Sequence, residues 1–441
     1  MDDSPLKIFA TDIIRTLVAR GHRAVFAGGC VRDMVRGQTP KDFDVATSAV
    51  PTEVMAIFPR TVPVGVAFGV VRVLGRGDDP LVVEVATFRI DGAYSDERHP
   101  DSVKFTNEVE DVKRRDFTIN GLLFDPLKNE LLDYVGGRED LDKKIIRAIG
   151  DPRLRFAEDH LRLLRAIRFA ARLDFEIDAN TFAAMKECAP KIVTVSAERI
   201  RDELNQLLAG PNPRRAFELL KKCGLLKHIL PEIDALQGVA QPPQFHPEGD
   251  VWLHTLMLLG QLENASLTLA LGALFHDVGK PPTFEMSDRI RFNEHEHVGA
   301  AMTEKILERL KYPREQIDRV VALVNQHMTF KDTRQMRAST LKRFLRQPHF
   351  DEHLALHKLD CLASHGDLSA HEFCAEELAR ATPETLRPAP LITGSDLIAL
   401  GLKPGPLFST ILKDVEDQQL EGTLGDLAAA REYVKGTYLK G

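Results

Sequence analysis

Cysteine pairs, long apolar runs and internal repeats are all missing from this chain of 441 residues. Its five cysteines contain no C-x-x-C pair, which argues against a disulfide scaffold or zinc ribbon and favours a reducing, cytoplasmic setting without a disulfide-linked partner. The apolar runs are far shorter than a membrane span, and MDDSPLKIF lacks a charged-then-apolar signal pattern. We therefore expect no membrane partner.

An excess of positive charge is missing as well. The net charge is −7, which argues against a protein that coats nucleic acid over its whole surface but leaves room for a local basic region. With 44% hydrophobic and 28% charged residues, the composition is that of an ordinary soluble globular protein. The length predicts about two to four domains.

The hydrophobic periodicity changes near residue 150. Before it, strand and helix signals alternate, which predicts an α+β domain with a mixed β-sheet and helices over residues 1–150. After it, helix signals dominate and predict all-α parts at 151–240, 245–365 and 366–441. The proline-rich stretch Gln241–Gly249 is the best linker candidate in the middle of the chain.

Gly28–Asp44 follows the first apolar strand signal. Two adjacent glycines allow close approach to a ligand, and a following helix N-terminus favours anions. Asp42 and Asp44 would share one face of a strand, where two carboxylates are costly unless a cation lies between them. The pattern predicts a Mg²⁺ pair that holds a nucleoside triphosphate; the alternative is a polar turn before an exposed strand.

A third carboxylate is predicted at Glu84. Residues 68–74 and 81–88 indicate a β-hairpin, and a lone Glu in so apolar a strand suggests a site residue, although an edge-strand charge is the alternative. The polar, turn-rich segment 89–110 after it predicts a mobile loop.

Two further groups suit nucleotide recognition. Three cations at 113–115 precede Asp116 and Asn120, which suits phosphate and sugar hydroxyls; a solvated charge run is the alternative. The amphipathic segment from residue 158 predicts one helix on which Asp159, Arg162 and Arg165 form a stripe. An ordinary intrahelical Asp–Arg pair is the alternative there.

Histidines gather after residue 250, where the chain is predicted to be helical. An adjacent His-Asp pair closes an apolar segment, and imidazole with carboxylate suits a divalent metal. His297 could be a surface neighbour rather than a ligand. The candidate ligands are His254, His276, Asp277, His295, His327 and Asp360.

The ordered motifs G-G-x-V-R-D with D-x-D, R-R-D-x-x-x-N and E-D-x-x-R-x-x-R resemble those of the class II tRNA nucleotidyltransferases (CCA-adding enzymes) and bacterial poly(A) polymerases. The resemblance covers about Val25 to Glu203. The histidine region resembles an HD domain with its H…HD…D pattern. The four predicted parts would then be a nucleotidyltransferase head, a helical neck that selects the nucleobase, an HD domain and a helical tail.

The resemblance implies a role for each candidate residue. Asp42 and Asp44 would bind catalytic Mg²⁺ with Glu84 as third carboxylate, and His295 and His327 fall where two-metal HD domains place further ligands of a divalent metal. The implied nucleotide contacts are Gly28, Gly29 and Arg32 for the triphosphate, Arg115, Asp116 and Asn120 for phosphate and ribose, and Asp159 and Arg162, with Arg165 beside them, for the base.

The implied activity is template-independent addition of CCA to the tRNA 3′ end from CTP and ATP. Partial CC- or A-addition and poly(A) synthesis share the same head; the retained 89–110 segment favours full or A-addition, and the acidic chain argues against a poly(A) polymerase. The HD site would act on 2′,3′-cyclic phosphates or other phosphoesters.

Two alternatives belong to other functional classes. One is an HD phosphohydrolase with an inert head, and the other is a non-catalytic RNA-binding protein.

Overall fold

The computed structural model describes residues 4–65, 68–77, 80–92, 103–242, 244 and 249–439. The chain divides into two compact units, Met1–Asp234 and Ala235–Gly441, which we describe separately. The linker predicted at Gln241–Gly249 lies largely outside the described residues. None of the helices within the described ranges is long and apolar enough to cross a membrane.

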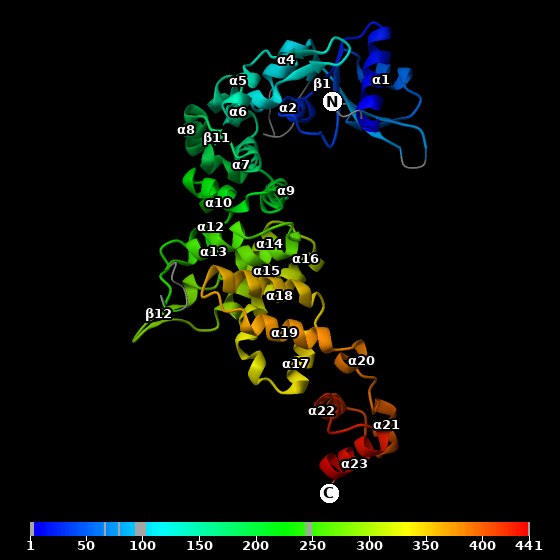
Figure 1. The fold of residues 1–441 in the computed structure, drawn as a ribbon, viewed down its shortest axis with the longest axis vertical. Coiled ribbons are helices and arrows are strands. Elements are labelled where there is room, and N and C mark those ends of the chain that lie inside the picture. The colour runs from blue at the N-terminus through cyan, green and yellow to red at the C-terminus, as the bar shows by residue number, and fades with distance from the viewer. Residues whose placement is uncertain are drawn as a thin grey trace. The chain divides into compact units, whose positions relative to one another are not determined.

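A mixed sheet forms the core of the first part of unit 1 (Figure 1). Its strands are β1 Ala24–Ala27, β2 Asp44–Thr47, β3 Thr61–Gly65, β4 Val70–Leu74, β5 Val82–Thr87, β8 Leu123–Asp125 and β9 Glu130–Leu132. They are ordered β3-β4-β5-β2-β1-β8-β9, and β2 runs parallel to β5 while the other neighbours are antiparallel. This order places the start of β2 beside β5, so carboxylates that are 40 residues apart in the chain become neighbours.

Short helices flank this sheet. α1 packs on β1, β2 and β5 and buries the face that carries Ile13, Ile14 and Leu17. The helices of this part are α1 Pro5–Ala19, α2 Gly29–Val35, α3 Pro51–Ile57, α4 Glu108–Lys113, the 3-10 helix Thr118–Asn120 and α5 Gly137–Asp142. The predicted α+β head with a mixed sheet is confirmed by this arrangement.

The prediction of a loop over residues 89–110 is wrong at both ends of this segment. β6 Arg89–Asp91 pairs with β7 Val103–Phe105 in an antiparallel ladder, and α4 begins at Glu108. The polar composition hid this pairing, because the strands lack the apolar alternation from which strands are predicted. Residues 93–102 of the predicted loop lie outside the described part of the chain.

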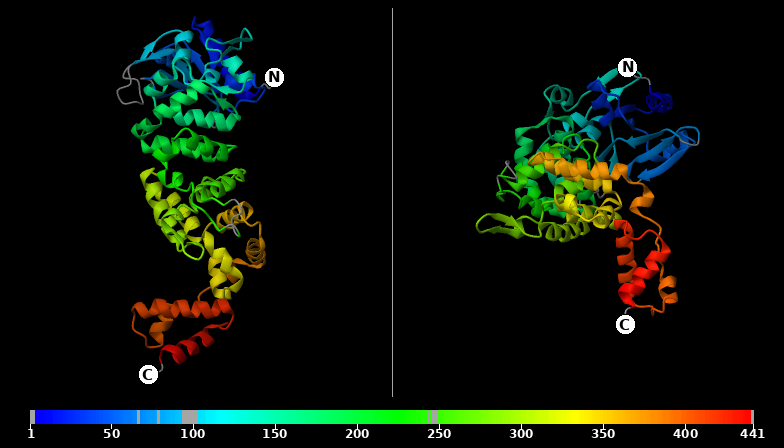
Figure 2. Two further views of the ribbon diagram at one scale, coloured as in Figure 1. Left: turned by 90° about the vertical axis from the view of Figure 1, so that its left-hand side faces the viewer. Right: turned by 60° about the horizontal axis from the view of Figure 1, so that its bottom comes forward.

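The second part of unit 1 is helical, and Figure 2 shows its green helices following one another in layers. α7 carries most of its apolar side chains inward and packs against α9 and α10. The helices are α6 Pro152–Glu158, α7 Arg162–Leu173, α8 Ala179–Cys188, the 3-10 helix Ala189–Thr194, α9 Ala197–Leu208, α10 Pro213–Lys222, α11 Leu226–Ile229 and α12 Pro231–Asp234. The parallel pair β10 Ile145–Ile146 and β11 Glu176–Ile177 joins α7 to the preceding segment.

Unit 2 is a set of helices with one small hairpin, β12 Phe284–Met286 and β13 Ile290–Phe292. One core joins Leu258, Ala273, Leu323 and Leu356, and a separate core holds the last helices together. The main helices are α13 Val251–Gly260, α14 Leu267–Phe275, α15 His295–Arg309, α16 Arg314–Gln326, the 3-10 helix His327–Gln335, α17 Ala338–Leu345, α18 Phe350–Ala363, α19 Ser369–Arg380, α20 Pro383–Leu386, α21 Gly394–Ala399, α22 Pro406–Glu421 and α23 Leu427–Tyr438. The prediction of helical domains after the head is confirmed.

Gly279 is the residue that lets the segment after α14 lie directly on α15. A Cβ atom at this position would lie 2.1 Å from the carbonyl oxygen of His295 and 2.6 Å from the amide nitrogen of Gly299, closer than any side chain tolerates. The absence of a side chain therefore brings the His276-Asp277 pair next to the start of α15, where His295 lies.

Candidate functional site

The turn after β1 places two glycines at the base of a cavity in unit 1. Gly28 has φ +75° and ψ −130°, a conformation that residues with a Cβ rarely adopt, and an added Cβ would lie 3.4 Å from Nη1 of Arg115. Gly29 begins α2, whose Arg32 is buried and donates from Nη1 to Oδ1 of Asn120 at 2.8 Å.

Asp42 and Asp44 face the same cavity, but only one of them is on a strand. β2 begins at Asp44, and Asp42 precedes it, so the prediction of both on one strand face is corrected. The intervening Phe43 is buried against Phe26, with ring centroids 5.2 Å apart, and this contact anchors the segment before the strand begins. The two carboxylates therefore lie on the same side through a fixed loop rather than through strand alternation.

Glu84 lies directly opposite Asp44 in the parallel register of β2 and β5. Burial, together with the charges of Asp42 and Glu84, raises the pKa of Asp44 to about 6. Glu84 does not line the cavity and accepts from Nε and Nη2 of Arg72 on β4, at 2.9 and 2.8 Å from Oε1. A buried carboxylate beside two others is the electrostatic arrangement that a divalent cation relieves.

Arg115 is fixed by a carboxylate that sequence reasoning missed. Asp111 is 2% exposed and accepts from both Arg114 and Arg115. Burial would raise the pKa of Asp111, but these two guanidinium groups hold it below its usual range. The i, i+3 and i, i+4 spacing within the segment 111–115 is the sequence signal that could have identified this clamp.

Asp116 and Asn120 belong to a buried hydrogen-bond chain. Asn120 donates from Nδ2 to Oδ1 of Asp116 at 3.1 Å, while Arg165 of α7 donates from Nη2 to Oδ2 of Asp116 at 2.6 Å. Burial opposes the charge of Asp116, yet Arg165 and these hydrogen bonds hold its pKa below the usual range. Together with the bond from Arg32 to Asn120, these hydrogen bonds fix α7 against α2 and the glycine turn before it.

The single helix predicted through Asp159 and Arg162 is wrong. α6 ends at Glu158, Asp159 has extended backbone angles, and α7 begins at Arg162. The Asp159 carboxylate causes the break because it accepts from the backbone amide of Leu161 at 3.0 Å, a turn bond that competes with helix formation. Asp159 and Arg162 are consequently not an intrahelical pair.

Each of these two residues has its own partner. Asp159 accepts from Nη2 of Arg199 on α9 at 2.8 Å, whereas Arg162 donates to Glu158 and to the carbonyl oxygen of Arg155. Both side chains line the cavity. Arg199 was not predicted as a site residue, since only the tertiary packing of α9 brings it to residue 159.

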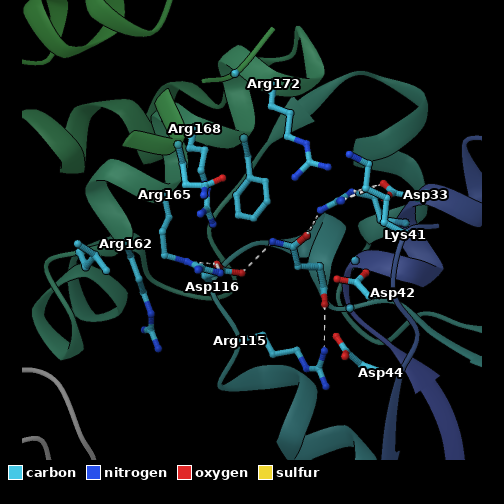
Figure 3. Close-up of a pocket in the computed structure, with 18 of the residues that line it drawn as sticks. Asp33, Lys41, Asp42, Asp44, Arg115, Asp116, Arg162, Arg165, Arg168 and Arg172 are labelled. Atoms are coloured by element: carbon cyan, nitrogen blue, oxygen red, sulfur yellow. Dashed lines mark hydrogen bonds and ion pairs between the residues drawn. The ribbon is translucent and has the colours of Figure 1, made fainter. Parts of the chain in front are cut away.

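The cavity has a volume of about 980 Å³ and a strongly cationic lining. Figure 3 shows Asp42 and Asp44 on one side and the arginines of α7 on the other. Nine guanidinium or ammonium groups and five carboxylates line it, so its net charge is opposite to that of the whole chain. Besides the predicted residues, the charged lining includes Asp33, Lys41, Arg114, Arg168, Arg172 and Arg199.

Unit 2 brings together all six predicted metal ligands in a second site. Two groups lie within metal-binding distance of one another: His254, His276 and Asp360 form one, and Asp277, His295 and His327 form the other. Asp277 lies between them, with Oδ2 3.2 Å from Nε2 of His276 and Oδ1 3.5 Å from Nε2 of His295. His297 is exposed and bonds to Asn325 instead, and is not part of either group.

The histidine geometry of this site fits a metal. The Nδ1 atoms of His276, His295 and His327 lie 3.0, 3.0 and 2.7 Å from backbone carbonyl oxygens, which leaves each Nε2 with its lone pair. The Nε2 atoms of His295 and His327 face each other at 3.2 Å, and two lone pairs at that separation repel unless a cation lies beside them. Burial and the neighbouring imidazoles lower the pKa of His327 to about 3, so it stays neutral at physiological pH.

Lys280 also belongs to this site, although it was not predicted as a site residue. Its Nζ lies 2.7 Å from Oδ2 of Asp277 and 2.6 Å from Oε1 of Gln241, and it is 5% exposed. Burial opposes the charge of Asp277, but His276 and Lys280 hold its pKa well below the usual range. Asp277 therefore carries a negative charge at the centre of the site.

Comparison with known proteins agrees with this division of sites. Residues 24–147 match the "Poly A polymerase head domain", 174–237 the "Probable RNA and SrmB- binding site of polymerase A", and 250–379 the "HD domain". The chain is 44% identical over 221 residues to the CCA-adding enzyme of Geobacillus thermodenitrificans and 40% identical over 253 residues to that of Limosilactobacillus reuteri. These matches cover 50% and 56% of this chain, and 54% and 62% of the relatives.

Solved structures resemble the fold over a longer range. A Bacillus stearothermophilus CCA-adding enzyme in complex with CTP has a TM-score of 0.74 at 27% identity, covering 99% of this chain and 100% of the other. A Thermotoga maritima CCA-adding enzyme complexed with tRNA has a TM-score of 0.60 at 20% identity, with 99% and 96% covered, and shows the fold alone. The chain spans only 54% to 62% of the length of the two curated relatives, whereas the similarity of fold extends over nearly the whole chain. The chain therefore carries a poly(A) polymerase head domain, a region similar to the RNA-binding site of polymerase A, and an HD domain, in that order.

Proposed function

We propose that unit 1 adds C and A nucleotides to the 3′ end of tRNA, with CTP and ATP as substrates and without a nucleic-acid template. The observation that carries this proposal is one cavity that combines the carboxylates Asp42 and Asp44, a cationic lining and the pair Asp159 and Arg162. The relatives named CCA-adding enzymes, and the similar structure in complex with CTP, support the same substrates.

Asp42 and Asp44 would hold Mg²⁺, with Glu84 beside them. When bound, the metal lowers the pKa of the attacking 3′-hydroxyl and stabilises the leaving pyrophosphate. Arg32 and Arg115 would neutralise the triphosphate and hold it in line with that hydroxyl, because phosphoryl transfer depends on positioning and charge rather than on covalent help from the protein. Asp116 and Asn120 would orient these cations and the ribose.

The base would be read by Asp159 and Arg162. Cytosine and adenine both present an exocyclic amine next to a ring-nitrogen acceptor, so a carboxylate that accepts and a guanidinium that donates match them. Guanine and uracil present a carbonyl group and an N–H, which leaves both protein groups unpaired. Asp159 is held by Arg199 and Arg162 by Glu158, so the two side chains have separate supports within the cavity wall.

Incubation of the chain with Mg²⁺, CTP, ATP and tRNA that lacks its 3′ end tests this function. Sequencing of the new terminus should show CCA for complete addition, and CC, A or a poly(A) tract for the related activities. Asp42→Ala should abolish incorporation, whereas Asp12→Ala, an exposed carboxylate on α1 paired with Arg15, should retain it. Incorporation by Asp42→Ala would contradict the proposed catalytic site, and tRNA binding without any incorporation would favour a non-catalytic RNA-binding protein.

We also propose a second activity, hydrolysis of phosphoesters such as 2′,3′-cyclic phosphates, at the divalent-metal site of unit 2. The six converging ligands and the charged Asp277 support it. An HD phosphohydrolase with an inert head is disfavoured, because Asp42 and Asp44, the cations and the pair Asp159 and Arg162 all line one cavity.

A further inference from the structure

Three arginines of the nucleotide cavity lie around a single aromatic ring, that of Phe169 on α7. The guanidinium carbons of Arg32 and Arg165 are each 5.5 Å from the ring centroid, and that of Arg168 is 5.0 Å from it. Phe169 lines the cavity and is 7% exposed. Phe117 packs on the ring in an edge contact, with centroids 5.8 Å apart, which fixes its plane.

The three guanidinium groups are otherwise held by separate partners. Arg32 pairs with its neighbour Asp33 and with a residue of the 3-10 helix Thr118–Asn120, Arg165 with a residue just before that helix, and Arg168 with a residue on α9. Among the polar contacts of the described residues, no carboxylate or amide serves all three cations; the Phe169 ring is the feature that they share. The contacts are Arg32 Nη1 to Asn120 Oδ1 at 2.8 Å, Arg32 Nε to Asp33 Oδ1 at 2.9 Å, Arg165 Nη2 to Asp116 Oδ2 at 2.6 Å, and Arg168 Nη1 to Glu203 Oε1 at 3.3 Å.

The Phe169 ring reduces the electrostatic cost of placing three arginines together. Like charges around one point repel one another, and they lose hydration where the cavity wall buries them. Burial is sufficient at Arg168 to lower its pKa from the usual value. The negative face of an aromatic ring attracts cations without adding a formal negative charge that would compete with an incoming triphosphate.

We propose that Phe169 is a positioning residue for the incoming nucleotide, whose ring holds Arg32, Arg165 and Arg168 in the arrangement that receives the triphosphate. Phe169 acts through these arginines rather than on the reacting atoms. The inference rests on the proposed nucleotidyl transfer at this cavity and adds a residue whose apolar side chain would otherwise be assigned to packing alone.

Three variants separate positioning from packing. Phe169→Leu keeps an apolar side chain but removes the ring, and Phe169→Tyr restores the ring. Phe175→Leu is the matched control: Phe175 is 3% exposed and has the guanidinium carbon of Arg36 5.5 Å from its ring, yet neither residue lines the cavity. The measurements are kcat and KM for CTP and for ATP, and calorimetric binding of inorganic tripolyphosphate.

Phe169→Leu should raise KM for both nucleotides about tenfold and weaken tripolyphosphate binding by a similar factor, with kcat changed far less. Phe169→Tyr and Phe175→Leu should remain near the wild type in both measurements. The proposal is overturned if Phe169→Leu and Phe175→Leu behave alike, or if Phe169→Tyr is as impaired as Phe169→Leu. A wild-type chain that incorporates no nucleotide would overturn the proposed function instead, and tripolyphosphate binding would still decide the role of Phe169.

Discussion

Burial and the neighbouring charges of Asp42 and Glu84 raise the pKa of Asp44 to about 6, against an ordinary value of about 4. The folded protein therefore binds a proton at Asp44 more tightly than the unfolded chain does. Between about pH 4 and pH 6 this difference stabilises the fold at the acidic end and is lost as the pH rises. A cation between the carboxylates offsets the free-energy cost of ionising Asp44, because it takes the place of the proton.

We predict a pH dependence that belongs to Asp44. In metal-free buffer, the free energy of unfolding of the wild type should fall from about pH 4 to pH 6 relative to Asp44→Asn, which has no charge to bury. Added Mg²⁺ at pH 7 should restore stability in the wild type only, and its apparent affinity should weaken about tenfold for each pH unit below 6. Denaturant unfolding with and without Mg²⁺ measures both effects. If the free energy of unfolding of the two proteins had the same pH dependence, Asp44 would not be the carboxylate whose pKa is raised.

The candidate carboxylates and ligands could be predicted at the residue scale, but their partners could not. Asp44 and Glu84 follow from charge in apolar strands, and the histidines follow from their number in one helical region. Arg72, Arg199 and Lys280 carry ordinary surface-type side chains in the sequence. Their roles depend on strand register, on the packing of α9 and on a buried contact with Asp277, none of which a local pattern contains.

At the scale of elements, β1, β2 and the β4–β5 hairpin follow from short apolar segments bounded by turn residues, whereas the break between α6 and α7 does not follow from the sequence pattern. The segment 158–171 has helical periodicity throughout, and Asp159, Arg162 and Arg165 suit one helix face. The decisive interactions are a turn bond from the backbone amide of Leu161 to Asp159 and the guanidinium of Arg199, 40 residues further on. The break leaves Asp159 in the cavity wall instead of on a continuous helix.

The base-selection hypothesis predicts a loss of discrimination when this wall is altered. The double variant Asp159→Ala/Arg162→Ala should lower the preference for CTP and ATP over GTP and UTP by about a hundredfold, because a wrong base no longer leaves a protein group unpaired. Single-nucleotide addition, measured as kcat/KM for each triphosphate, tests it.

The control for base selection is Arg214→Ala/Glu218→Ala, which removes an i, i+4 ion pair of α10 that does not line the cavity. Its base preference should equal that of the wild type. Unchanged selectivity in the Asp159→Ala/Arg162→Ala variant would contradict base selection. The role of these two residues would then be to hold α6, α7 and α9 together.

At the scale of the whole molecule, charge is distributed by site. The chain is acidic, with a net charge of −7, yet the cavity of unit 1 has more cations than carboxylates in its lining. Such a local cationic region attracts a triphosphate and an RNA end without coating nucleic acid generally. The metal site of unit 2 is built entirely from residues of that unit, and the cavity of unit 1 from residues of unit 1.

Because the two sites share no residue, we predict that a substitution in one site leaves the activity of the other intact. His276→Ala/Asp277→Ala should lose the bound divalent metal and the hydrolysis of 2′,3′-cyclic phosphates to phosphomonoesters, while nucleotide addition to tRNA continues; Asp42→Ala should show the reverse. His297→Ala is the matched control, since this exposed histidine on α15 is outside the ligand groups and should leave metal content unchanged. Elemental analysis after removal of loosely bound metal tests the assignment, with formation of the phosphomonoester from the cyclic phosphate followed by chromatography in parallel. Metal retained by the double variant would show that these side chains are buried for packing rather than for coordination.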